Sequence, residues 1–238
     1  MRRKKGLFWE HRTGFRLLLI LLSVCTIGRL LPIFVFADEG VYRSVETDSK
    51  RIALTFDDGP HPVLTQKILS ILEKYNVKAT FFMVGVNVVN YPEAANAVIR
   101  AGHEVGNHTF SHHTVTRLDE ATMHTEIERC EDVLRELCEY RPHIFRPPQG
   151  AINPCVTQYS KDANYSVILW SLDTRDWEIK DAASIAQSVL SRVQGGDIIL
   201  MHDYIGTNSK TPEALEIILP KLLAHGFEPV TVRELLGN

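Results

Sequence analysis

Short apolar runs alternate with longer amphipathic segments from residue 51 to the end of the chain. The short runs predict strands at 51–56, 79–84, 103–106, 144–146, 167–172, 197–202 and 227–230. The longer segments predict helices near 62–75, 87–101, 119–139, 153–163, 181–193 and 211–225. Gly102 and Gly226 stand where two of these helices would end, a common position for glycine.

This alternation of strand and helix indicates a parallel sheet with right-handed crossovers. Seven predicted strands are too few for a regular eightfold barrel, and an open doubly wound sheet remains compatible with the pattern. In α/β sheets and barrels alike, functional groups gather at the carboxyl ends of the strands.

The first 37 residues have a different pattern from the rest of the chain. Four basic residues at 2–5 precede an almost wholly apolar stretch, 17–36, which ends at Ala37. This order is typical of a secretory signal peptide cleaved after Ala37. The apolar stretch also approaches the ~20 residues that span a bilayer, so an uncleaved membrane anchor is the alternative. We therefore expect a signal or anchor at 1–37, a linker at 38–50 and one folded domain at 51–238.

The charge of the chain is divided unevenly between these parts. Residues 1–37 carry seven Lys or Arg and one Glu, a net +6, so the formal −3 of the whole chain leaves −9 for the remainder. A nucleic-acid-binding surface needs a basic stripe to neutralise phosphates. We therefore expect no nucleic-acid partner, and membrane contact only through the N-terminal segment.

Ligand-type side chains follow two of the predicted strands. The first strand runs into Asp57-Asp58-Gly59-Pro60, which as an isolated sequence is typical of a turn with capping aspartates. After the strand at 103–106 come His108 and His112, whose spacing would place both imidazoles on one face of a helical turn. Two imidazoles and a carboxylate can hold a first-row divalent metal.

These two stretches, Thr55-Phe56-Asp57-Asp58-Gly59-Pro60 and Asn107-His108-Thr109-Phe110-Ser111-His112-His113, resemble the first two motifs of the polysaccharide deacetylases, the NodB-homology or carbohydrate esterase family 4 enzymes. Phe145-Arg146-Pro147-Pro148-Gln149-Gly150 resembles the third motif, Asp173-Thr174-Arg175-Asp176-Trp177 the fourth and Ile199-Leu200-Met201-His202-Asp203 the fifth. The matches follow the family's order and leave only residues 1–50 outside. The resemblance implies a distorted (β/α)7 barrel and a polysaccharide deacetylase domain at 51–238.

The resemblance also implies a function, the metal-dependent hydrolysis of N-acetyl groups from an extracytoplasmic polysaccharide. It assigns Asp58, His108 and His112 to one divalent metal. Zn²⁺ suits a mixed oxygen and imidazole set best, with Co²⁺ or another first-row ion as alternatives. The implied partner is an N-acetylated glycan, and the implied location is secreted, in the cell wall or on the outer face of the membrane.

Four further residues receive catalytic roles from the resemblance. Asp57 is the base that accepts a proton from water, and Arg146 beside it would keep the carboxylate ionised and oriented. His202 is the general acid that protonates the departing amine. Asp176 is the carboxylate that orients and tunes His202.

Three residues are expected to contact substrate. Trp177 would wall the sugar groove, although core packing explains it equally well, and Leu200 would line the acetyl pocket or the core. Gln149 departs from the family, which usually has an aromatic residue or Gly at this position. The backbone N–H that helps to stabilise the oxyanion survives this change, so only the shape of the groove is affected.

Three functions are compatible with these residues. The first is N-deacetylation of N-acetylglucosamine in peptidoglycan or chitin-type chains. It is favoured because relatives that act on the muramic sugar tend to depart from the first motif at the metal carboxylate, whereas this chain keeps Asp58. The second is an O-acetyl esterase on a polysaccharide such as xylan, which would depend less on His202. The third is a non-catalytic glycan-binding domain, which the retention of Asp57 and His202 disfavours.

Overall fold

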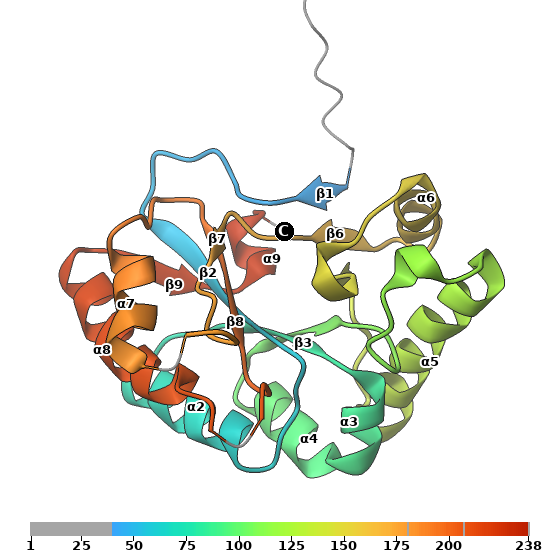
Figure 1. The fold of residues 1–238 in the computed structure, drawn as a ribbon, viewed down its shortest axis with the longest axis horizontal. Coiled ribbons are helices and arrows are strands. Elements are labelled where there is room, and N and C mark those ends of the chain that lie inside the picture. Colours follow the sequence, from blue (N-terminus) through green and yellow to red (C-terminus); the bar gives the residue numbers. More distant parts are fainter. Residues whose placement is uncertain (1–39, 180, 207, 238) are drawn as a thin grey trace, which may run out of the picture. The chain divides into compact units, whose positions relative to one another are not determined.

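The computed structural model describes residues 40–179, 181–206 and 208–237 (Figure 1). The expected signal or anchor at 1–37 lies outside these residues, and the described residues form one compact unit. Within the described ranges, no helix is long and apolar enough to cross a membrane.

In the described part of the chain, nine strands form one sheet. They are β1 (Val41–Tyr42), β2 (Arg51–Asp57), β3 (Thr80–Met83), β4 (Glu104–Asn107), β5 (Ile144–Phe145), β6 (Ser166–Ile168), β7 (Leu172–Asp173), β8 (Ile198–His202) and β9 (Glu228–Val230). The α-helices are α2 (Leu64–Lys74), α3 (Gly85–Asn90), α4 (Pro92–Arg100), α5 (Glu120–Cys138), α6 (Pro154–Asp162), α7 (Ala182–Leu190), α8 (Thr211–Ala224) and α9 (Val232–Leu235). Two short 3-10 helices cover Val115–Arg117 and Pro148–Gly150.

The sheet is parallel throughout its paired strands, in the order β1-β6-β5-β4-β3-β2-β8-β7, with β9 added beside β2. The central strand β2 pairs with β8 along one edge and with β9 and then β3 along the other. Among the described residues, the terminal strands β1 and β7 do not pair with each other, so the sheet curls without closing (Figure 1). The distorted barrel expected from the sequence is confirmed.

Two predicted elements are divided in the structure. The helix expected at 87–101 is two helices, α3 and α4, separated at Tyr91, which has a non-helical φ of −137° and precedes Pro92. The residue before a proline is disfavoured in the helical region, which explains the break. The strand expected at 167–172 is also two strands, because β6 pairs with β1 and β5 whereas β7 pairs with β8. A further strand, β1, lies within the range expected to be a linker.

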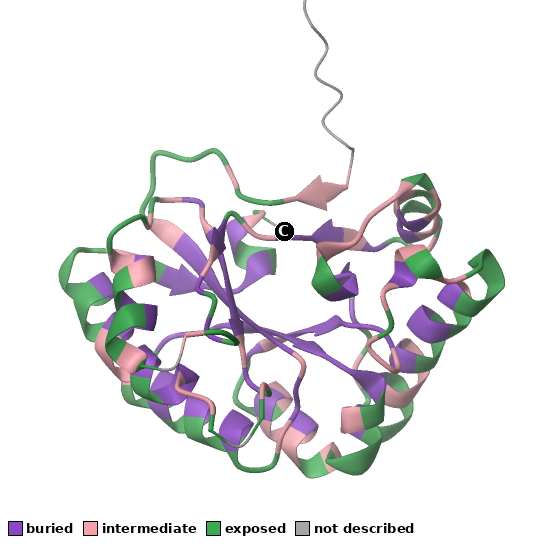
Figure 2. Cartoon of the chain, in the orientation of Figure 1, coloured by how far each residue is buried: buried purple, intermediate pink, exposed green. Residues whose placement is uncertain are grey.

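Alternate residues of β2 pack on opposite faces of the sheet. Ile52, Leu54 and Phe56 join the large core beneath the surrounding helices, whereas Ala53 joins a smaller cluster with Phe82. The helices are buried toward the sheet and exposed outward (Figure 2). Apolar side chains thus fill the layers on both faces, and the polar residues described next emerge where the strands end.

Candidate active site

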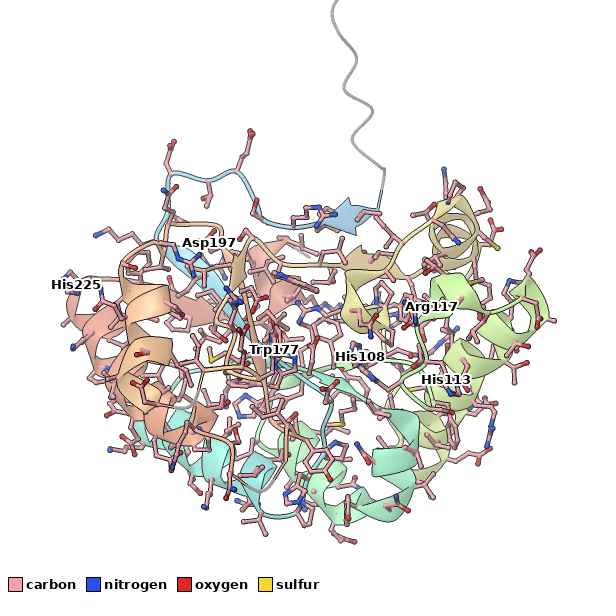
Figure 3. The ribbon with its side chains drawn as sticks, in the orientation of Figure 1. His108, His113, Arg117, Trp177, Asp197 and His225 are labelled. Atoms are coloured by element: carbon pink, nitrogen blue, oxygen red, sulfur yellow. The ribbon has the colours of Figure 1, made fainter. Side chains whose placement is uncertain are left out.

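The candidate catalytic residues lie at the carboxyl edge of the sheet. Asp57 is the last residue of β2 and His202 the last of β8, and the register of the two strands pairs them directly. His108 follows the last residue of β4, and Arg146 follows β5. Figure 3 labels His108 and Trp177 near the centre of the view, whereas His225 lies at the periphery. Parallel strands bring these groups together because all their carboxyl ends share one edge.

Asp58, His108 and His112 form the cluster expected from the sequence, with one ligand atom of each residue within 4.8 Å of the others. Oδ1 of Asp58 lies 3.0 Å from Nε2 of His112 and 3.4 Å from Nε2 of His108. Zinc bonds of ~2.0–2.2 Å at tetrahedral angles separate ligand atoms by about 3.3 Å. The spacing of these three atoms therefore fits one ion of that size.

The hydrogen bonds around the cluster are also compatible with a cation bound between the three side chains. Nδ1 of His108 lies 2.6 Å from the carbonyl oxygen of Arg146, which can only accept, so Nδ1 donates to it and Nε2 is the nitrogen directed at Asp58. Oδ1 of Asp58 is buried and has no hydrogen bond of good geometry within the described part of the chain. Burial opposes ionisation of Asp58, but its contacts with the two histidines outweigh burial and hold its pKa far below the usual range. A carboxylate oxygen and two imidazole nitrogens directed at one another form the donor set of a divalent metal site once the imidazoles are neutral.

Two residues of this cluster lie in strained loops. Asp58 has a φ of +76° and His112 a φ of +59°, both in the left-handed region that is uncommon for residues other than glycine. His112 therefore does not lie one helical turn from His108, as the spacing suggested. A loop containing a second left-handed residue, Thr109, brings the two imidazoles together instead, with ring centroids 5.0 Å apart.

Asp57 is held by the buried guanidinium of Arg146. Nη1 of Arg146 donates to Oδ1 of Asp57 at 2.7 Å and to Oγ1 of Thr55 at 2.8 Å. The other two nitrogens, Nε and Nη2, donate to the carbonyl oxygens of Ile168 and Leu169, each at 3.0 Å. Burial lowers the pKa of Arg146, and the negative charge of Asp57 opposes that effect. Asp57 is therefore fixed in orientation, as the sequence predicted.

His202 is held by Asp176 in the loop that follows β7. Nδ1 of His202 donates to Oδ1 of Asp176 at 2.7 Å, while its backbone N–H and the hydroxyl of Thr211 both donate to Oδ2. Burial favours the neutral imidazole, but the hydrogen bond and charge of Asp176 outweigh burial and raise the pKa of His202 to about 9. An imidazolium that keeps its Nε2 proton at neutral pH can serve as an acid.

The three expected substrate contacts occupy different environments. Trp177 is 50% exposed, which excludes the core-packing interpretation, whereas Leu200 is buried in β8. Gln149 has a left-handed φ of +61°, and its Oε1 accepts a hydrogen bond from the hydroxyl of Thr114 at 3.1 Å. Its side chain therefore packs toward the loop that follows the histidines.

Two buried carboxylates beside the site received no role from the sequence. Glu126 of α5 accepts from both the backbone N–H and the hydroxyl of Ser111, each at 2.8 Å, and so holds the histidine loop. Asp203 is 2% exposed, and burial raises its pKa to about 7 although the hydrogen bond from Thr65 opposes the rise. The position of Asp203 in the fifth motif could have indicated that it belongs to the site. Glu126 lies on an ordinary amphipathic helix, and no sequence feature indicated a role for it.

The fold and these strand-end groups are those of an α/β-barrel hydrolase. The family model described as polysaccharide deacetylase matches residues 44–168, just over half of the chain, and the chain belongs to this family. This finding confirms the family and enzyme class expected from the five motifs.

Individual relatives agree with this assignment. A peptidoglycan-N-acetylglucosamine deacetylase of Bacillus cereus is 39% identical over 194 residues, which cover 81% of this chain and 91% of the relative. The peptidoglycan-N-acetylmuramic acid deacetylase PdaC of Bacillus subtilis is 38% identical over 192 residues, 81% of this chain and 40% of PdaC. The solved structure of the peptidoglycan N-acetylglucosamine deacetylase Bc1960, in complex with an N-hydroxybenzamide, has a TM-score of 0.80 at 34% identity and covers 82% of this chain and 92% of that one.

Proposed function

We propose that this deacetylase removes N-acetyl groups from N-acetylglucosamine units of peptidoglycan or a chitin-type chain outside the cytoplasm. The observation that carries the proposal is the direct pairing of Asp57 and His202 on neighbouring strands, beside the cluster of Asp58, His108 and His112. Amide hydrolysis needs a base for the water and an acid for the amine, and this pairing supplies both groups at one point.

Asp58, His108 and His112 would hold one divalent metal, for which Zn²⁺ is the best match to a mixed oxygen and imidazole set. When bound, such an ion polarises a carbonyl and lowers the pKa of water. The proton on Nδ1 of His108, donated to the carbonyl oxygen of Arg146, keeps Nε2 directed into the cluster.

Asp57 would accept the proton of the attacking water. Its Oδ1 is bound by Arg146, whereas its Oδ2 lies 3.7 Å from Nε2 of His108 and so borders the cluster. Because Arg146 fixes one carboxylate oxygen, the other has a defined direction. His202, with Nδ1 committed to Asp176, would donate the proton on Nε2 to the departing amine. The backbone N–H of Gln149 would donate to the oxyanion.

The choice of sugar depends on the groove beside these groups. Trp177 offers a half-exposed aromatic face to a pyranose ring, and Gln149 replaces the usual aromatic residue or Gly. The retention of Asp58 favours N-acetylglucosamine over the muramic sugar as the unit that is deacetylated. The similar identities to a glucosamine enzyme and to the muramic acid enzyme PdaC make the product the deciding measurement.

The purified protein should therefore be incubated with peptidoglycan, chitin oligomers and O-acetylated xylan, followed by digestion and mass spectrometry. Loss of acetyl from glucosamine units is the expected result. Loss from muramic units alone would overturn the choice of sugar, and release from xylan alone would make the protein an esterase. Absence of acetate release from all three, with an intact fold by circular dichroism, would favour the non-catalytic alternative.

The metal is tested separately. Treatment with a chelator should abolish activity, and Zn²⁺ or Co²⁺ should restore it. Full activity after exhaustive dialysis against chelator, with no metal found by elemental analysis, would contradict the metal assignment.

Export through the N-terminal segment completes the proposal, because a wall glycan is reached only outside the cytoplasm. N-terminal sequencing of the exported protein should begin at Asp38. A full-length chain in the membrane fraction would select the anchor instead, and a full-length chain in the cytosol would reject export.

A further inference from the structure

The turn after β2 carries both adjacent carboxylates, and its backbone is tied at three consecutive carbonyl groups. The oxygen of Asp57 accepts from the N–H of Asp203 at 3.1 Å, and that of Gly59 accepts from Val84 at 2.8 Å. Between them, the oxygen of Asp58 accepts from the side-chain amide of Asn87 at 2.8 Å. A left-handed residue such as Asp58 persists only where its surroundings determine its conformation in this way.

The side chain of Asp203 continues this restraint to the far end of the turn. Its Oδ2 accepts from the hydroxyl of Thr65 at 2.5 Å, and Oγ1 of Thr65 in turn accepts from the N–H of His61 at 2.8 Å. Asp203, the residue that follows β8, therefore binds the backbone before Asp58 and, through Thr65, the backbone after it.

Gly59 is required for this arrangement by close approach. Its φ is outside the left-handed region, but a Cβ at this position would lie 2.1 Å from Oδ2 of Asp203. The carboxylate thus packs directly against the peptide that follows Asp58, where any larger residue would push the two apart.

The environment of Asp203 argues against a role in packing alone. The carboxylate is almost completely buried, and its Oδ1 has no hydrogen-bond partner among the described residues. A buried carboxylate costs stability compared with an apolar side chain of similar size. The presence of a carboxylate at position 203 is explained if the hydrogen bond between Asp203 and Thr65 is needed for function.

We propose that Asp203, acting through Thr65, is a positioning residue that holds Asp58 in the conformation in which its carboxylate meets His108 and His112. The proposal rests on the proposed function, since it takes Asp58 to be a metal ligand. Asp203 itself touches neither the substrate nor the metal. Its effect is to preorganise the turn, so that metal binding does not have to order it.

The test uses Thr65, because substitution at Asp203 would also disturb the neighbouring His202. Thr65→Val deletes the hydroxyl and keeps the shape of the side chain, whereas Thr65→Ser keeps the hydroxyl. Metal-free protein is titrated with Zn²⁺ against a chromophoric chelator, and kcat, KM and the melting temperature of the metal-free form are measured in parallel. A matched control is Thr122→Val, which removes a similar hydroxyl bond, 2.8 Å to Asp119, at the start of α5.

Loss of a group that orients a metal ligand typically weakens metal affinity or activity ~10–100-fold. We expect Thr65→Val to weaken Zn²⁺ binding by about that factor and to lower kcat with little change in KM. Thr65→Ser should restore both, and Thr122→Val should leave both unchanged. If Thr65→Val does not fold, Thr65→Ala compared with Thr65→Ser gives the same contrast.

Two results would overturn the proposal in different ways. If wild type binds Zn²⁺ but Thr65→Val binds it equally well, or changes only the melting temperature, Asp203 has no positioning role and the metal site stands. If wild type itself binds no Zn²⁺, the metal assignment fails first and the positioning role fails with it.

Discussion

The two halves of the site are built differently. Asp57 and His202 end regular, directly paired strands, and each is held by one buried partner, Arg146 or Asp176. Asp58 and His112 instead lie at left-handed positions in loops. The proposed proton-transfer groups are thus placed by strand register, and two of the proposed metal ligands, Asp58 and His112, by hydrogen bonds that stabilise otherwise unfavourable backbone conformations.

This difference predicts how the two halves respond to substitution. A register-placed residue can be exchanged for an isosteric one without moving its neighbours, because backbone pairing is unchanged. A loop-placed ligand moves when a residue that restrains the loop is lost, even if the ligand itself is intact. The histidine loop has such a residue in Glu126, as the carboxylate turn has in Asp203.

The largest expected effect comes from Asp57→Asn. The amide can still accept from Arg146 but cannot take a proton, so kcat should fall by about 10²–10⁴-fold. Zn²⁺ affinity should be retained, because Asp57 is not in the ligand cluster. Parallel measurements of turnover and metal content check this, with Asp58→Asn as the comparison. If Asp57→Asn empties the site and Asp58→Asn does not, the roles of the two carboxylates are reversed.

His202→Asn should have a similar effect on amides and a smaller one on esters. Loss of the general acid should lower kcat about 10²–10⁴-fold on an N-acetylated oligosaccharide. The rate on an aryl acetate should fall far less, because phenolate departs without protonation. Rates on the two substrates, measured with the same enzyme preparation, check the prediction. Equal losses on both would show that His202 does not protonate the leaving group.

Asp176→Asn should move the alkaline limit of activity to lower pH. The hydrogen bond and charge of Asp176 outweigh the effect of burial and raise the pKa of His202 from the ordinary 6.5 to about 9. A cation bound nearby would lower this pKa somewhat. The alkaline limb of kcat/KM in wild type should therefore lie at or slightly below pH 9, and in the variant well below it. If the alkaline limb of kcat/KM is unchanged in the variant, the ionisation of His202 does not cause that limb.

The same substitution should change how stability depends on pH. Because the pKa of His202 is higher in the folded than in the unfolded protein, protonation of His202 stabilises the fold. This contribution is fully present below pH 6.5 and is lost as the pH rises through about 9. Urea unfolding of metal-free protein across this range should show the loss in wild type and a smaller change in Asp176→Asn.

The smallest effect is expected at Trp177, which belongs to neither half. We expect its half-exposed ring to contribute to substrate binding and not to proton transfer, so Trp177→Ala should raise KM by about 2–10-fold with kcat nearly unchanged. Leu137→Ala, at a 43% exposed position on α5, is the matched control and should change neither constant. A large loss of kcat in Trp177→Ala would instead place the ring against the reacting groups.

Hydrophobic periodicity and five short motifs were enough to predict the barrel, the family and the strand ends at which the candidate catalytic residues lie. Periodicity reports which side chains are buried within one element, and the carboxyl ends of parallel strands necessarily share one edge. Asp57, His202 and Arg146 could be predicted to lie together for this reason, and the structure brings them together.

Other features depended on the tertiary structure. The break at Tyr91 and the division of 167–172 into β6 and β7 follow from a proline and from pairing with different strands. Glu126 of α5 binds the left-handed loop that brings His108 and His112 together, and Asp203 restrains the turn at Asp58 from a segment far away in sequence. Their conformations are unfavourable for each segment alone, and only contacts with the rest of the fold make them stable.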